Sequence, residues 1–233
     1  MAISIDTVYQ RVLALANKEQ RGYITPQEFN LFANQAQLEI LEQYFYDINQ
    51  FGRVHGNDTA YSDMIGLLNE KLSIFKKYSL MTLNITTHGL GSVRSNSLPS
   101  DLFKLGSIMT NNYEADEVSV STFKLMSTSP LTVASSNIPV YILEGNEVIV
   151  FGAGSSCKIA YIKKPNIVSW GYVVVGEKAM YDQTSTTNFE LHSLEESELV
   201  YRILTLAGVT LNRQDLTGIG AAMQQTKIQQ EKI

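Results

Sequence analysis

The sequence contains few of the residues from which disulfides, metal sites and membrane spans are built. It has one cysteine, Cys157, which excludes an internal disulfide and is typical of a protein made in a reducing cytoplasm. The three histidines, His55, His88 and His192, are far apart, and none has metal-ligand spacing with another candidate ligand. No run approaches eighteen apolar residues, so no membrane span is predicted.

The sequence also contains few charged residues, and its net charge is small. Only 18% of the residues are charged, the formal net charge is −5, and the pI is about 5.3. Proteins that hold nucleic acid through many phosphate contacts usually have the opposite balance, so a broad DNA-binding surface is not expected. The 44% of hydrophobic residues indicates a chain that folds around a core.

Catalytic signatures are missing as well. We find no Gly-x-Ser-x-Gly, no His-Glu-x-x-His and no glycine-rich turn between a strand and a helix. Glu195, Glu196 and Glu198 are clustered, but carboxylates are favoured at a helix N-terminus. Cys157 lies in a strand-like segment, where a small buried side chain is the ordinary role. The sequence therefore predicts neither an enzyme nor a bound cofactor.

The segment Arg21–Asn30 admits a calcium-loop interpretation. With Gly22 at loop position 6, Glu28 falls at position 12, as an EF-hand requires. Positions 1 and 5 would then be Asn17 and Arg21, and a guanidinium cannot coordinate a cation. A degenerate EF-hand-like binding module remains an alternative, but no metal is predicted.

The same residues also fit a connection between two helices. Gly22 is suited to end the first helix in a left-handed conformation. Thr25 is placed to cap the second helix, Pro26 fits its first turn, and Glu28 completes a capping box.

The spacing of the apolar residues changes along the chain, which divides into a helical part, a strand part and a second helical part. Helical spacing predicts helices over 4–20, 26–49 and 61–77, and again from Ser193, which forms a capping box with Glu196, to Gly208. Strands are predicted over 80–86, 116–123, 139–143, 147–151 and 158–162, with a turn at 144–147. These strands have no helices between them, so we predict an antiparallel sheet. The predicted class is α+β, a helical bundle (1–79 and 190–233) with an inserted antiparallel β domain (80–189).

Two segments suggest contacts with other chains. The helix over 26–49 has apolar residues on more than one face, and several of its polar positions are amides, whose burial costs less than that of ions. The tail after Asp215 is too polar to build a core alone. The predicted interface residues are Phe32, Leu38, Leu41, Phe45, Met223 and Ile228.

Several blocks of the sequence resemble a known family. Val8–Asn30, followed by a helix rich in Ala and Gln, resembles a structural protein of crAss-like and related short-tailed phages. Leu98-Pro-Ser-Asp101 is similar to the Leu-Pro-x-Asp that begins the β region in that family. The shorter similarities are Tyr161–Pro165 with Trp170, Phe189–His192 and Leu206–Val209; Phe151-Gly-Ala departs from the family pattern.

The resemblance implies a head-to-tail connector, or tail adaptor, similar in plan to that of T7-like phages. Such a protein forms a homo-oligomeric ring in the virion neck, twelve-fold if it matches the portal. Its partners would be itself, the portal protein, downstream tail or neck proteins, and genomic DNA that passes without sequence-specific binding. An acidic channel lining would suit this role, because each phosphate contact would hold the DNA. The alternative is another tail component with a carbohydrate-binding β domain, for which Trp170 and Tyr172 are the only indication.

Overall fold

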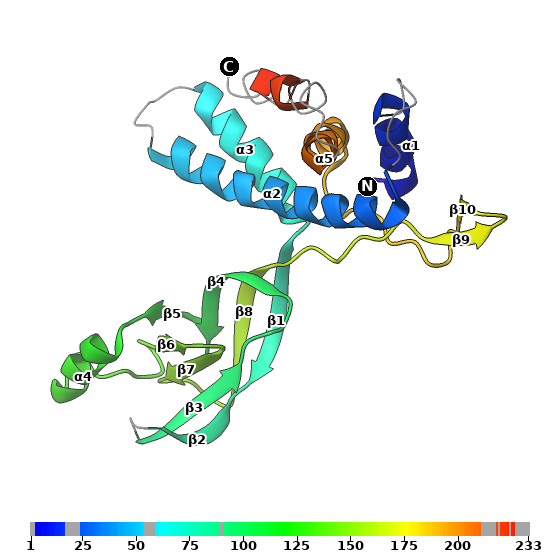
Figure 1. The fold of residues 1–233 in the computed structure, drawn as a ribbon. Coiled ribbons are helices and arrows are strands. Elements are labelled where there is room, and N and C mark those ends of the chain that lie inside the picture. Colours follow the sequence, from blue (N-terminus) through cyan, green and yellow to red (C-terminus); the bar gives the residue numbers. More distant parts are fainter. Residues whose placement is uncertain are drawn as a thin grey trace. The chain divides into compact units, whose positions relative to one another are not determined.

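The computed structural model describes residues 3–16, 24–53, 59–88, 91–210, 218, 220–223 and 225–226. The chain forms two compact units, Met1–Ile74 with Pro165–Ile233, and Phe75–Lys164. The class is α+β, as predicted, with most helices in the first unit and most strands in the second (Figure 1). The expected boundaries at 80 and 189 are corrected to Phe75 and Lys164. Residues 165–189 belong with the helices, and side chains of the second helix hold the backbone of residues 166–170.

The helical unit is built from α1 (Ile5–Ala16), α2 (Pro26–Arg53), α3 (Thr59–Ser73) and α5 (Glu196–Thr210). A 3-10 turn, η2 (Ser193–Glu195), precedes α5. The helix α5 contacts both α1 and α2, and α2 also contacts α3. The apolar stripe of α1 is buried, as its spacing predicts, at Ile5, Val8, Tyr9, Val12 and Ala16.

The capping box at the start of α2 is confirmed. Glu28 Oε2 accepts a hydrogen bond from the Thr25 backbone N–H at 2.9 Å, and Thr25 Oγ1 accepts one from the Glu28 N–H at 3.3 Å. The backbone and side-chain hydrogen bonds from Thr25 lower the pKa of Glu28. This carboxylate is therefore already used within the chain. Gly22 and the other calcium-loop positions over 17–22 lie outside the described residues.

Other helix ends differ from the expectation. The helix α3 ends at Ser73, and Lys76 and Lys77 lie in β1 (Lys76–Thr82) rather than at a helix end. At α5, the Nδ1 atom of His192, not the Ser193 side chain, accepts a hydrogen bond from the Leu194 N–H at 3.4 Å. Gly208 does not end α5, which continues to Thr210.

The second unit contains a curled eight-stranded sheet. Its strands are β1, β2 (Asn84–His88), β3 (Gly91–Ser97), β4 (Leu102–Thr110), β5 (Tyr113–Glu117), β6 (Val140–Glu144), β7 (Glu147–Phe151) and β8 (Ser156–Lys163). Their order is β1-β8-β4-β5-β6-β7-β3-β2. Only Leu83 separates β1 from β2, so one bent strand supplies both ends of this order. All described pairings in this sheet are antiparallel except the short parallel pair of β5 and β6.

The curled sheet encloses an apolar core. The core residues are Met81, Leu83, Ile108, Ala115, Tyr141, Val148, Val150, Cys157, Ile159 and Tyr161. The turn predicted at 144–147 is confirmed, with Glu144 paired to Glu147 and Gly145 at φ 60°.

The predicted strand over 116–123 is only partly present. It ends at Glu117, and α4 (Val120–Thr128) follows, because Ser119 Oγ accepts a hydrogen bond from the Thr122 N–H at 3.2 Å and caps a helix. Phe123 of this helix stacks on Phe151 at a centroid distance of 3.8 Å. The short helix α4 thus covers one outer part of the sheet.

Two of the motifs that carry the family resemblance meet in this unit. The Asp101 carboxylate accepts hydrogen bonds from Lys77 Nζ at 2.8 Å and from the Tyr161 hydroxyl at 3.0 Å. The Lys164 N–H donates to the Asp101 carbonyl oxygen. Leu98–Asp101 and Tyr161–Pro165 therefore join the start of β4 to the end of β8.

Candidate interaction surfaces

Three amide side chains on one face of α2 hold the extended segment 166–170. Asn34 accepts from the Val168 N–H and donates to the Val168 carbonyl, both at 2.9 Å. Asn30 likewise accepts a hydrogen bond from the Trp170 N–H at 2.8 Å and donates one to the Trp170 carbonyl at 3.4 Å. Gln37 donates to the Asn166 carbonyl at 3.0 Å. Helix positions 30, 34 and 37 share a face, and alternate residues of an extended chain have a similar spacing. This contact is why the segment belongs to the helical unit.

The amides of α2 are therefore used inside the chain. The sequence suggested that the amide positions of this helix could be buried between chains. Instead, Asn34 and Gln37 bond the 166–170 segment, and Gln43 accepts a hydrogen bond from Arg202 of α5. For these three residues, the amide-rich face is explained by contacts within one subunit.

The predicted interface residues of α2 have different environments. Leu41 has 0% exposure and lies in the core of the chain itself, so its assignment to an interface is wrong. Helical periodicity identified an apolar face, but not that other parts of the same chain cover it. Phe32, Leu38 and Phe45 are half-buried, and their interface role stays a prediction.

The C-terminal residues are only partly described. Met223 is exposed, whereas Ile228 lies outside the described residues. Gly220 is buried, and a Cβ atom there would lie 3.1 Å from the Tyr201 carbonyl oxygen of α5. Part of the tail thus packs on its own subunit, which the polar composition did not predict.

A hairpin of β9 (Tyr172–Val175) and β10 (Lys178–Tyr181) extends from the helical unit (Figure 1). Its base is fixed by Trp170, whose ring packs on those of Tyr172 and Tyr181 at 5.9 Å and on Tyr9 of α1 at 4.2 Å. The Trp170 indole N–H donates to Asp6 at 2.9 Å. Because Trp170 is 3% exposed, it does not offer a flat surface for a sugar ring.

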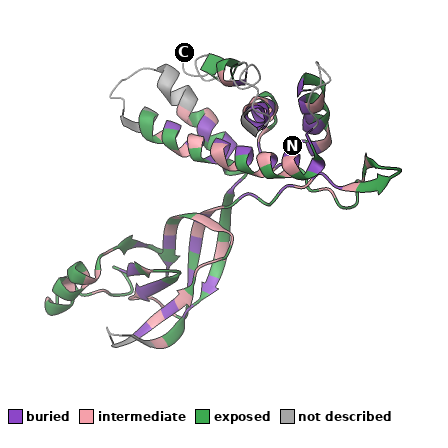
Figure 2. Ribbon diagram, viewed as in Figure 1, coloured by how far each residue is buried: buried purple, intermediate pink, exposed green. Residues whose placement is uncertain are grey.

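The outer part of this hairpin exposes apolar side chains on both of its faces. Val174 is 64% exposed, and Val173, Val175 and Met180 are each more than half exposed (Figure 2). Adjacent strand residues point to opposite faces, so the three consecutive valines supply both. A two-stranded hairpin is marginal alone in water. The Val-Val-Val-Gly-Glu sequence was the available signal for it, although we predicted no strand there.

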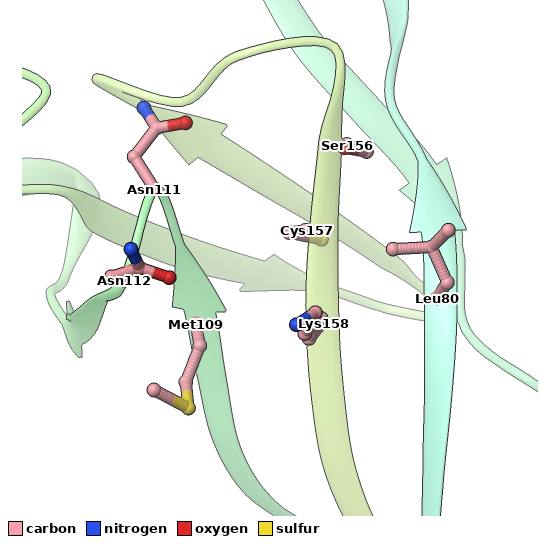
Figure 3. A pocket seen from close by; sticks show the side chains of 7 residues that line it. All are labelled: Leu80, Met109, Asn111, Asn112, Ser156, Cys157 and Lys158. Carbon is pink, nitrogen blue, oxygen red and sulfur yellow. The ribbon is translucent and has the colours of Figure 1, made fainter.

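A second open surface lies on the outer face of β1, β8 and β4. A groove there is lined by Leu80, Met109, Asn111, Asn112, Ser156, Cys157 and Lys158, with β8 in the middle (Figure 3). It continues toward Tyr78, Ser107 and Ala160 as a hollow of about 470 Å³. Ser107 and Ala160 lie in register with Tyr78, which is 78% exposed. Because the side chains of Ser107 and Ala160 are small, they leave a hollow beside the Tyr78 ring.

The charge of this sheet face is uniform. The strand register places Lys76 and Lys104 on either side of Ile162, and Lys158 between Leu80 and Met109. None of the residues aligned on this three-stranded face is a carboxylate, although the chain as a whole is acidic. The surface combines apolar area with positive charge, as protein interfaces with an acidic partner do.

Cys157 does not act as a nucleophile in this groove. Its side chain points into the core, and burial raises the pKa of its thiol to about 11. Among the described residues there is also no group of three or more His, Cys, Asp or Glu side chains that could hold a metal ion.

Charged side chains are buried between the helices of the first unit. Lys71 of α3 lies 2.6 Å from Glu195 of η2, and both are almost fully buried. On α5, Arg202 pairs with Glu198 one turn earlier. The first pair joins α3 to η2 and the second lies within α5, and their burial gives both pairs a structural role.

Comparison of the chain with protein-family models and with the sequences of curated proteins gave no match. No described helix is both long and apolar enough to cross a membrane.

Proposed function

We propose that this chain is a structural subunit of a phage head-to-tail connector, which forms a ring between the portal and the tail around the DNA channel. The observation that carries the proposal is the exposure of apolar side chains on two separate surfaces, the β9–β10 hairpin and the outer face of β1, β8 and β4. Large apolar patches on a protein surface usually mark sites of contact with other proteins.

The sequence resemblance supports the same assignment. Its most specific block, Val8–Asn30, includes the capping box that starts α2. Two shorter blocks are joined through Asp101 and Tyr161, so these residues have a common structural role.

A connector needs two kinds of contact, one between its own subunits and one with neighbouring virion proteins. The hairpin is suited to the first kind, because it extends from the helical unit. The lysine-bearing sheet face is suited to the second, since it combines apolar area with positive charge and can match an acidic surface of a neighbouring virion protein. In this assignment the chain has no chemistry of its own, and the genomic DNA passes through the ring.

The test is the assembly state of the purified chain, alone and mixed with the portal protein from the same genome. We expect closed rings in electron micrographs and, by native mass spectrometry, one mass that corresponds to a fixed copy number, twelve if the ring matches the portal. A chain that stays monomeric at high concentration and also fails to join the portal would contradict the proposal.

A further inference from the structure

We infer that the β9–β10 hairpin of one subunit docks in the groove between α1 and α5 of the next copy of the same chain. This inference rests on the proposed function, because it assigns the contact that repeats around the ring. Both surfaces belong to the helical unit.

The groove has the shape and character of a receptor for an apolar hairpin. It has a volume of about 310 Å³, and its lining comes from three positions on each helix: Arg11, Ala14, Leu15, Ser197, Val200 and Tyr201. On both helices the spacing is i, i+3, i+4, so each helix presents one ridge. Leu15 is exposed although it is a large apolar residue.

The groove has room for the outer end of the hairpin. Four strand residues span about 13 Å at 3.3 Å each. The lining residues run from Arg11 to Leu15 and from Ser197 to Tyr201, so each wall is about one helical turn, roughly 6 Å long. The tip of the hairpin can therefore enter the groove with Val174 and Val175 between the two ridges.

The charges at the tip of the hairpin and at the groove are complementary. The tip of the hairpin carries Glu177 followed by Lys178, one acid and one base. At the groove, Arg11 forms an ion pair with Glu196 at 2.9 Å. The tip can exchange partners with this pair, so that each charge still has an opposite charge nearby.

The position of α1 makes the contact intermolecular. The base of the hairpin packs on Tyr9, through Trp170. A helix turns by about 100° per residue, so Arg11, Ala14 and Leu15 lie roughly on the opposite side of α1 from Tyr9. A hairpin fixed at its base cannot reach the groove of its own chain. Two different surfaces that face in different directions make a head-to-tail contact, which repeats from copy to copy and forms a ring when its rotation closes.

The tight turn at the tip fits this role. Gly176 and Glu177 both have positive φ, at 55° and 64°, and they form a two-residue connection between Val175 and Lys178. Such a turn matches the twist of the strands and gives a narrow end. A narrow end allows the hairpin to enter a groove between two helices.

The experiment is chemical cross-linking with a short bis-maleimide in a Cys157→Ala background, alone and with the portal. Val174→Cys and Leu15→Cys are introduced together in one chain, and also separately. We expect the double variant to give a ladder of cross-linked multimers up to the ring size. An equimolar mixture of the two single variants should give dimers as the main product, because each chain then has only one reactive surface.

The outcomes separate this inference from the proposed function. Rings that form without cross-links in the double variant would overturn the docking inference and leave the connector proposal intact. Dimers from Val174→Cys alone would also overturn it, because they would show hairpins paired with each other. A chain that never assembles, with or without the portal, would overturn both proposals.

A second variant measures the strength of the contact. Val174→Asp should raise the concentration at which rings form by at least tenfold, with the fold of the subunit unchanged by circular dichroism. The matched control is Leu31→Asp, at a similarly exposed apolar residue of α2 that lies in neither surface. Equal effects of the two variants would contradict docking through the hairpin.

Discussion

The two units of this chain bury different kinds of side chains. In the described part of the helical unit, the buried polar residues include Lys71, Glu195, Glu198, Arg202, Asp47 and Gln37. In the described part of the β unit they are Ser95 and Thr110. The β unit is held by backbone pairing around an apolar core, whereas the helical unit depends on side-chain partners that each need a particular counterpart.

This difference has a physical consequence for mutation. An apolar core loses stability in proportion to the volume removed, and neighbouring side chains relax in part. A buried charge that loses its partner keeps the full cost of its desolvation. We therefore expect the helical unit to be more sensitive than the β unit to single substitutions that remove one polar partner.

Each unit contains its own probe, so the comparison can be measured. Trp170 is the only tryptophan and lies in the helical unit, and Cys157 is the only cysteine and lies in the core of the β unit. Tryptophan fluorescence reports on the first unit, and the rate of thiol labelling reports on the second.

The largest effect is expected from Leu41→Asp. The substitution places a carboxylate where a leucine is fully buried, so the helical unit should unfold. Trp170 fluorescence should shift to that of exposed indole at neutral pH, while Cys157 stays protected from labelling. Leu31→Asp, on the exposed side of the same helix, is the control and should leave the fluorescence unchanged. Loss of both signals together would show that the units unfold as one.

Glu195→Ala should cost about 3–5 kcal/mol of stability in the helical unit, because Lys71 is left buried without this partner. The measurement is the urea midpoint by Trp170 fluorescence. The double variant Lys71→Met with Glu195→Leu should recover most of the loss, since it replaces the pair with apolar side chains. Lys77→Ala breaks an exposed pair in the β unit and should have a much smaller effect on thiol labelling. No recovery in the double variant would contradict the ion-pair explanation.

Asn34→Leu should destabilise the helical unit by about 2–3 kcal/mol, because the N–H and the carbonyl of Val168 both lose their partner. Gln35→Leu is the control, because Gln35 neighbours Asn34 in sequence but is exposed, and its side chain donates a hydrogen bond to Glu39 on the same helix at 2.9 Å. Its effect should stay below about 0.5 kcal/mol. Similar losses from both variants in urea titrations would mean that the amide contacts with segment 166–170 contribute little.

The sequence was sufficient where one local signal determines the structure. The capping box of Thr25 with Glu28 and the Gly145 turn involve residues close in the chain, and both are present as predicted. The sequence was insufficient where pairing between distant strands determines the structure. The strand β3, Gly91–Ser97, has little strand propensity, and its hydrogen bonds to β2 and β7 keep it extended.

The interaction surfaces were harder to predict than the fold. Apolar periodicity showed that Leu41 is buried, but whether its own chain or a neighbour covers it depends on long-range packing. The hairpin was missed for a related reason, because consecutive valines do not alternate as a half-buried strand does. Its position depends on Trp170 packing on α1, which has no local signature.

The smallest effect concerns the pH dependence of the β unit, through Asp101. The hydrogen bond from Lys77 is the main cause that lowers the pKa of Asp101, and the Tyr161 hydroxyl adds to it. A carboxyl whose pKa is lower in the folded state stabilises the fold above its unfolded pKa of about 3.9, and this contribution is lost as the pH falls through the folded value. Asp101→Asn should therefore reduce the urea midpoint of the β unit, followed by Cys157 labelling, at neutral pH. The difference from the wild type should shrink below about pH 4 and at high salt, because the pair is partly exposed. If the difference in urea midpoint between Asp101→Asn and the wild type did not change with pH, Asp101 would act through hydrogen-bond geometry alone. The charge of the Lys77 pair would then contribute nothing to joining β1, β4 and β8.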